Sequence, residues 1–198
     1  MLKQLFDYLI AFLLMNLFFP VILLISAINF LLYFKNPFFV QERIGKNGKS
    51  FFIIKFRTMK NANSKDWDPK EDISRLTFFG GILRKYSLDE VPQLINVLLG
   101  NMSLVGPRPL PMEYLPLFND VQNSRHWVKP GITGWAQING RNSISWEERF
   151  EMDVWYVKNY SFKLDMIILF KTFMHLFRKK GINKSSDLTM DKFTGTKN

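Results

Sequence analysis

The chain has 198 residues, of which 16% are aromatic, no cysteine and a formal net charge of +10. This length suits a single domain with its own core. The lack of cysteine excludes disulfides, Cys-ligated zinc, iron–sulfur clusters and thiol nucleophiles, and His126 and His175 are too few to build a histidine metal site. We therefore expect any bound metal to be a hard cation held by oxygen atoms.

The N-terminal segment is apolar, and residues 8–34 contain no charged side chain. A membrane span needs roughly 20 apolar residues, so this segment is long enough to cross a bilayer. Pro20 lies near its middle and predicts a kink, because proline removes one helical hydrogen bond. A kinked transmembrane helix and a re-entrant helix that breaks at Pro20 both remain open. Lys3 and Lys35 on the two flanks favour the re-entrant form, since positive charge tends to stay on the cytoplasmic side.

A hairpin and two short helices are predicted next in the chain. Residues 37–59 favour a β-hairpin, because aromatic and β-branched runs flank the turn sequence at residues 45–48. Residues 61–75 are polar with mixed charge and predict a solvated loop. Residues 76–100 predict two short helices, and Gly100 is a plausible stop for the second.

Proline and glycine dominate the connections that follow. Residues 105–116 and 128–142 are rich in both, which argues against a regular helix or a central strand there. Ser145 and Glu148 form a capping-box pattern, which predicts a helix that runs to about Asn159.

The last strongly patterned segment is residues 162–180, which are mostly apolar with a basic side. Such a helix either lies at the membrane surface with its aromatic side chains inserted or packs in the core with a solvated basic end. The apolar N-terminal segment favours the interfacial interpretation, because it already places the chain at a membrane.

Asp89 and Glu90 are the first candidates for chemistry. Pro92 fits only the first turn of a helix, so the two carboxylates lie at or next to a helix N-terminus. Acidic residues there are often simple caps. In the functional interpretation the helix dipole keeps Asp89 ionised and draws phosphate toward it. An ionised carboxylate can bind Mg²⁺ or attack phosphorus.

Several basic residues are placed to bind phosphate. Arg108 lies between two prolines and Arg141 follows a glycine, so loop geometry restricts both guanidinium groups. Arg84 lies just before the acidic pair, and Lys55 lies on the second strand of the hairpin. Each alone is typical of a solvated surface, whereas together they predict a diphosphate site.

Two other classes of function compete with an enzyme. A non-catalytic membrane-associated scaffold would use the arginines to bind lipid headgroups or a partner protein. A nucleic-acid-binding module would explain the positive charge, but the apolar segment argues against it and no familiar nucleic-acid motif is present. Neither a P-loop nor a G-x-G-x-x-G motif is present, so a nucleotide is not held in those ways.

The sequence resembles the bacterial sugar transferases, the monotopic phosphoglycosyl transferases, and among them the smallest members. The similarity covers about residues 3–180. It rests on the apolar opening with Pro20 and on the blocks QERIG (41–45), KFRTM (55–59), LRKYSLDEVPQLINVLLGNMSLVGPRPL (83–110) and VKPGITGWAQINGRNSISWEERFEMDVWYV (128–157). Phe19 departs from the family pattern, which has a small serine before the central proline.

The resemblance implies a transfer of sugar-1-phosphate from a UDP-sugar to undecaprenyl phosphate, with release of UMP. It assigns Asp89 as the nucleophile that forms a covalent phosphosugar intermediate, and Glu90 to acid–base work in the second step. It also implies Mg²⁺ at Asp89. The residues that it places around the phosphates or the nucleotide are Lys55, Arg84, Arg108 and Arg141.

From these observations we expect an α/β protein, mostly α, with three parts. These are a re-entrant membrane helix (1–35), a catalytic domain with a short β-hairpin and amphipathic interfacial helices (36–184), and a polar tail (185–198). The resemblance places the chain as a monotopic protein on the cytoplasmic face of the bacterial inner membrane, in contact with its lipid, at the first membrane step of glycoconjugate biosynthesis. The expected donor is UDP-N,N′-diacetylbacillosamine, as in protein glycosylation, or a related N-acetylated sugar, with a hexose as the alternative.

Overall fold

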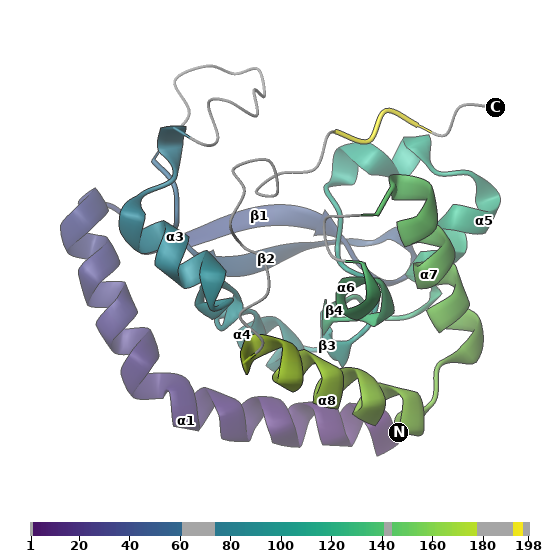
Figure 1. Ribbon diagram of the computed structural model, residues 1–198, viewed down its shortest axis with the longest axis horizontal. Coiled ribbons are helices and arrows are strands. Elements are labelled where there is room, and N and C mark those ends of the chain that lie inside the picture. The colour runs from purple at the N-terminus through teal and green to yellow at the C-terminus, as the bar shows by residue number, and fades with distance from the viewer. Residues whose placement is uncertain (1, 61–73, 141–143, 178–191, 196–198) are drawn as a thin grey trace.

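A computed structural model describes residues 2–60, 74–140, 144–177 and 192–195. A long helix, α1, runs along one side of the molecule, a hairpin crosses the middle, and the later helices gather at the opposite end from the bend in α1 (Figure 1). The helices are α1 (Leu2–Tyr33), α3 (Phe78–Lys85), α4 (Gln93–Leu98), α5 (Asp120–Asn123), α6 (Trp135–Asn139), α7 (Trp146–Asn159) and α8 (Phe162–Phe177). The strands are β1 (Phe38–Ile44), β2 (Ser50–Phe56), β3 (Ser103–Val105) and β4 (Gly131–Thr133). The described part is thus mainly helical, as the sequence predicted, and it contains two small sheets, of which the sequence predicted the β1–β2 hairpin.

Helix α1 contains Pro20 and changes direction sharply partway along its length (Figure 1). The helix nevertheless continues from Leu2 to Tyr33. The chain therefore bends within one helix, and no break divides it into two helices. Within the described ranges, α1 is the one helix that is long and apolar enough to cross a membrane. It buries few of its residues against the protein and exposes large apolar side chains along its length. This exposed apolar surface suits lipid.

Polar side chains fasten both ends of α1 to the rest of the chain. Near the N-terminus, Lys3 Nζ lies 2.5 Å from a carboxylate oxygen of Asp165 on α8. Near the C-terminus, the buried Asn29 amide donates to the carbonyls of Pro37 and Arg57, at 3.2 and 3.0 Å. The polar residues within this apolar helix therefore anchor it to the body of the protein.

The predicted hairpin is confirmed. Strands β1 and β2 pair in antiparallel register from Phe38–Phe56 to Ile44–Ser50. Asn47 and Gly48 make the turn with positive φ angles of 57° and 74°, a conformation that asparagine and glycine adopt most easily. The Asn96 amide of α4 bonds the backbone of β2, where it accepts from Ile54 N at 3.0 Å and donates to Phe52 O at 2.7 Å. Asn96 therefore ties helix α4 to the outer side of the hairpin.

The local signals for helix ends are confirmed as well. The two short helices predicted within residues 76–100 are α3 and α4, and Gly100 follows the second with a φ of 80°. Ser145 and Glu148 make a complete capping box at the start of α7, which ends at Asn159. Most of the loop predicted at residues 61–75 lies outside the described residues.

The prediction that the Pro- and Gly-rich stretches hold no regular helix was wrong at α6, and the same stretches contribute to a pair of short strands that the sequence did not predict. Strands β3 and β4 form a short parallel pair, with Val105 opposite Thr133, and α6 follows β4 directly. The prolines lie outside these elements, and glycine makes the pairing possible. A Cβ atom on Gly131 would lie 2.1 Å from the backbone nitrogen of Gly106, so only glycine lets the two segments approach this closely.

Helix α8 lies alongside the first half of α1 in Figure 1. It buries Ile168 fully, whereas Phe170 and Phe173 are 65% and 57% exposed. One side of α8 therefore packs on the core and the other presents aromatic residues, as an interfacial helix does.

Phe193 belongs to the segment that the sequence analysis assigned to a polar tail. Its ring is buried and packs against Tyr114, Phe118, Trp146 and Phe150. At least this residue of the segment contributes to the core.

Candidate active site

Asp89 and Glu90 lie in a single 3-10 turn, Leu88–Glu90, that leads into α4. Ser87 precedes the turn with a positive φ of 55°, and Pro92 is the N-terminal cap of α4. The predicted position of the acidic pair, next to a helix start, is confirmed. The turn packs on strand β2 and helix α3, and α4 in turn packs on α1, so the pair is placed by elements from three parts of the chain.

Glu90 is held by two cations that are distant in sequence. Its Oε1 accepts from Lys55 Nζ at 2.6 Å and from Arg108 Nη2 at 2.9 Å. Burial by itself would raise the pKa of Glu90, but Arg108 and Lys55 outweigh burial and hold this pKa far below its usual range. In return Glu90 raises the pKa of Arg108, whereas burial lowers the pKa of Lys55. Glu90 is therefore ionised and locked between two positive charges.

Asp89 differs from its neighbour, because within the described residues its carboxylate accepts no hydrogen bond and makes no ion pair. Burial and the charge of Glu90 raise its pKa, against the opposing charges of Lys55, Arg84 and Arg108. The sequence analysis expected a helix dipole to keep Asp89 ionised, whereas its surroundings in the structure make this carboxylate more basic than usual. An unpaired, basic carboxylate among cations has the properties of a nucleophile for an anionic substrate.

Of the two remaining residues predicted to bind phosphate, Arg84 and Arg141, the structure describes only Arg84. Arg84 lies in the last turn of α3, where Nε donates to Thr58 Oγ1 at 3.1 Å and Nη2 contacts Met59 Sδ at 3.1 Å. Its charge acts on Asp89 and lowers the pKa of that carboxyl. Arg141 lies outside the described residues. The structure thus brings Lys55, Arg84 and Arg108 to the acidic pair.

The sequence analysis missed further arginines near Arg108. Arg149 on α7 is buried and Arg43 on β1 is partly buried, and burial together with the charge of Arg108 lowers the pKa of each to about 10. Arg43 stands in the QERIG block, which contributes to the family resemblance but was not assigned to phosphate binding. Several guanidinium groups that repel one another favour binding of a polyanion in this region.

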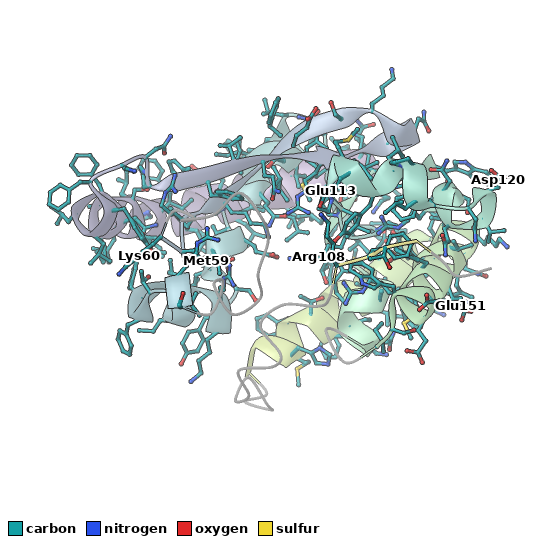
Figure 2. The ribbon with its side chains drawn as sticks, turned by 90° about the horizontal axis from the view of Figure 1, so that it is seen from above. Met59, Lys60, Arg108, Glu113, Asp120 and Glu151 are labelled. Carbon is teal, nitrogen blue, oxygen red and sulfur yellow. The ribbon has the colours of Figure 1, made fainter. Side chains whose placement is uncertain are left out.

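A backbone ladder holds the loop that carries Arg108. Gly106 N donates to Thr133 O at 2.9 Å, and Gly131 N donates to Pro107 O at 3.0 Å. Seen from above, Arg108 lies between the Met59 end of the hairpin and the helices that carry Asp120 and Glu151 (Figure 2). The loop thus presents the guanidinium group of Arg108 between the hairpin and these helices.

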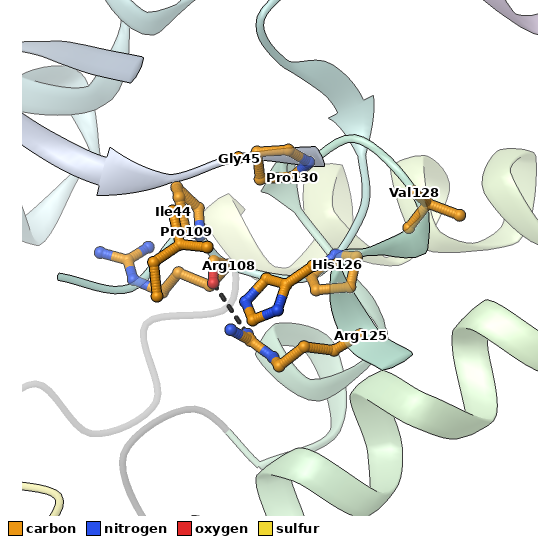
Figure 3. Close-up of a pocket in the computed structure, with 9 residues that line it drawn as sticks. Ile44, Gly45, Arg108, Pro109, Arg125, His126, Val128 and Pro130 are labelled. Carbon is orange, nitrogen blue, oxygen red and sulfur yellow. Dashed lines mark hydrogen bonds between the residues drawn. The ribbon is translucent and has the colours of Figure 1, made fainter. Parts of the chain in front are cut away.

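Behind this loop lies a small cavity of about 10 Å³, lined by residues that include Pro109 and His126 (Figure 3). Pockets that bind drug-sized ligands are typically about 300–1,000 Å³, so this cavity is too small for a nucleotide sugar. Burial and the charge of Arg125 lower the pKa of His126 to about 3, and its Nδ1 pairs with Asn123. A neutral, buried imidazole of this kind does not serve as a general base near neutral pH.

The carboxylate of Asp89 is the group at this site that could help to hold a magnesium ion, together with a substrate. Within the described residues no group of three or more His, Asp or Glu side chains could hold a metal by itself. Mg²⁺ is usually bound by one or two carboxylates together with substrate phosphates and water, and the unpaired carboxylate of Asp89 suits such a site.

A family model described as bacterial sugar transferase matches residues 1–179, which is nearly the whole chain. The chain belongs to the bacterial sugar transferase family. Within this family it is similar to the uncharacterized sugar transferase EpsL of Bacillus subtilis (strain 168), with 50% identity over 195 residues, 98% of this chain and 96% of that protein.

Two further sugar transferases have more specific names. The chain is similar to the undecaprenyl-phosphate galactose phosphotransferase of Salmonella typhimurium, with 41% identity over 159 residues, 71% of this chain and 33% of that protein. It is also similar to the UDP-N-acetylgalactosamine-undecaprenyl-phosphate N-acetylgalactosaminephosphotransferase of Aeromonas hydrophila, with 37% identity over 179 residues, 86% of this chain and 42% of that protein. The family resemblance drawn from the sequence is confirmed.

Proposed function

We propose that the protein transfers sugar-1-phosphate from a UDP-sugar to undecaprenyl phosphate through a covalent intermediate on Asp89. The observation that carries this proposal is the contrast within the acidic pair. Glu90 is neutralised by Lys55 and Arg108, whereas Asp89 beside it is unpaired, basic and surrounded by positive charge. The names of the two relatives that act with undecaprenyl phosphate support the substrate class.

In the first step a carboxylate oxygen of Asp89 attacks the phosphorus that bears the sugar. The new bond joins Asp89 to that phosphorus, and the bond from this phosphorus to the bridging oxygen breaks, so UMP leaves with the bridging oxygen. Arg84 and Arg108 lie where their charges act on Asp89 and would offset the charge that builds on the phosphoryl oxygens. The raised pKa of Asp89 favours attack, since a more basic carboxylate is a better nucleophile.

In the second step a phosphate oxygen of undecaprenyl phosphate attacks the same phosphorus and releases the Asp89 carboxylate. Glu90 is assigned to acid–base work on this acceptor. Its low pKa makes it a weak base while Lys55 and Arg108 both bind it. An acceptor phosphate that draws either cation to itself would raise the pKa of Glu90. Acceptor binding would therefore make Glu90 a stronger base.

Mg²⁺ bound at Asp89 would neutralise phosphate charge in both steps. The chain itself would contribute the carboxylate ligand, on which the charges of Arg84 and Arg108 act. Two steps at one site let a soluble donor and a lipid acceptor use the same residues in turn.

For the membrane we propose a monotopic arrangement on the cytoplasmic face of the inner membrane, with α1 re-entering at its bend. The exposed apolar surfaces of α1 and α8 support it, as does the attachment of both ends of α1 to one domain through Lys3 and Asn29. Cysteine substitutions near residue 3 and near residue 40 should label from the same side of sealed vesicles. Labelling from opposite sides would contradict the re-entrant arrangement and leave the chemistry untouched.

UMP release measured across a panel of UDP-sugars, with undecaprenyl phosphate and Mg²⁺, tests the reaction and its donor. We expect an N-acetylated sugar, UDP-N,N′-diacetylbacillosamine or a related one, to be the preferred donor in a pathway of glycoconjugate assembly such as protein glycosylation. The relatives act on both galactose and N-acetylgalactosamine donors, so hexoses belong in the panel. Absence of UMP release with every donor would favour a non-catalytic membrane scaffold.

A further inference from the structure

Arg125 is a buried arginine in the 3-10 turn Ser124–Trp127, behind the loop that carries Arg108. Its Nε and Nη2 both donate to Oδ2 of Asp153 on α7, at 3.1 and 2.6 Å, and each of these two residues is only 1% exposed. The rings of Phe118 and Phe150 lie 5.8 and 5.6 Å from the guanidinium carbon. The ion pair and the two rings together fix this guanidinium in one position.

The same guanidinium binds the backbone of Arg108. Nη2 of Arg125 donates to the carbonyl oxygen of Arg108 at 2.9 Å, and Figure 3 shows this bond as the link between the two residues. Within the described residues no other group donates to this carbonyl. The side chain of Arg108 extends away from it to Glu90. Arg125 thus binds the backbone of Arg108, while the side chain of Arg108 binds Glu90.

We propose that Arg125 and Asp153 are positioning residues that set the place of Arg108 against Glu90, an inference that rests on the proposed function. The loop is bonded on either side of Arg108, by Gly106 N to Thr133 O and by Ile44 N to Leu110 O. Gly131 N also holds the Pro107 carbonyl just before Arg108, and the Arg108 carbonyl itself is bound by Arg125. A misplacement of about 1 Å at a catalytic site can cost on the order of 100-fold in rate, so losing this bond should weaken catalysis without any direct contact with substrate.

Burial of the Arg125–Asp153 ion pair does not by itself indicate that these residues serve only to stabilise the fold. Replacing such a pair by apolar residues of similar volume is often neutral for stability, whereas removing one partner strands a buried charge and is destabilising. The double variant Arg125→Met with Asp153→Leu therefore separates the two roles. It removes both charges together and places apolar side chains against the rings of Phe118 and Phe150.

We expect this double variant to melt within about 3 °C of the unmodified protein, because both charges leave together. Its rate of UMP release should fall by about 30- to 100-fold. Lys158→Met, an exposed change on the same helix, should leave both quantities unchanged. A double variant that melts normally and works normally would overturn the inference.

A second measurement decides the matter if the double variant unfolds early. Arg125→Lys keeps a positive charge but loses the guanidinium fork that binds Asp153 and the Arg108 carbonyl together, so we expect it to lower the rate of UMP release by about tenfold. If Arg125 acts through Arg108, then Arg108→Ala with Arg125→Lys should lose at most about threefold more than Arg108→Ala alone. A double variant whose loss of rate equals the product of the two single losses would overturn the inference. An unmodified protein that is inactive with every UDP-sugar contradicts the proposed function instead, so the two failures are distinguishable.

Discussion

Replacing Glu90 by glutamine tests the electrostatic arrangement of the site through stability. Glutamine keeps the shape of the side chain but removes the charge that balances Lys55 and Arg108, which contact it at 2.6 and 2.9 Å. A hydrogen bond to a charged group contributes about 1.5–3 kcal/mol, so we expect Glu90→Gln to lower the free energy of unfolding by about 2–4 kcal/mol near neutral pH. In a chain of this size that loss lowers the melting temperature by roughly 5–12 °C.

The pH dependence gives this prediction its sign. The pKa of Glu90 is lower in the folded than in the unfolded protein, so its contribution is complete above the unfolded value of about 4.5 and is lost as pH falls toward the folded value. The difference in melting temperature between the unmodified protein and Glu90→Gln should therefore be full at pH 7 and shrink below about pH 4.5.

Thermal melts in detergent and metal-free buffer, without substrate, between pH 7 and pH 3.5 would measure this difference. Glu113→Gln is the control, because Glu113 makes an exposed ion pair with Lys192 at 3.3 Å, and exposed pairs contribute little. A difference for Glu90→Gln of less than about 1 °C at pH 7, or one that does not change with pH, would refute the reasoning.

Three further predictions concern the fold and the metal. Gly131→Ala should destabilise the protein by about 3 kcal/mol or more, since its Cβ would lie 2.1 Å from Gly106 N. Gly81→Ala should be neutral or stabilising, because the nearest neighbour of its Cβ would lie at 4.0 Å. Chemical or thermal unfolding of both variants checks this. Phe193→Ala should cost about 3–5 kcal/mol of stability and increase proteolysis of the C-terminal segment, and an unchanged melting temperature would speak against its burial. Removing Mg²⁺ with a chelator should abolish UMP release and added Mg²⁺ should restore it, while activity that survives chelation would remove the metal from the mechanism.

Local sequence rules predicted the parts of the fold that depend on a few neighbouring residues. The capping box at Ser145 and Glu148 and the helix stop at Gly100 follow from hydrogen bonds and dihedral angles within one turn, and both are confirmed. The position of Asp89 and Glu90 next to a helix start follows from Pro92 in the same way. These features need no knowledge of distant contacts.

Contacts between distant segments could not be predicted from the residues alone. Lys55 lies 35 residues from Glu90 in sequence, and only the packing of β2 against the turn brings the two together. The pair of Arg125 and Asp153 spans 28 residues and has no local pattern. The β3–β4 pair was missed because the prolines and glycines around it argue against strands, while the close approach of Gly106 and Gly131 that permits pairing is a tertiary property.

The most direct test of the account is capture of the covalent intermediate on Asp89. The protein incubated with Mg²⁺ and its preferred UDP-sugar, without undecaprenyl phosphate, should release about one equivalent of UMP and gain the mass of one sugar phosphate. Peptide mapping should place this mass on Asp89, Asp89→Asn should show neither change, and added undecaprenyl phosphate should remove the label. Steady UMP release that requires the acceptor from the outset, with no labelled protein, or a label on another residue, would contradict the central claim.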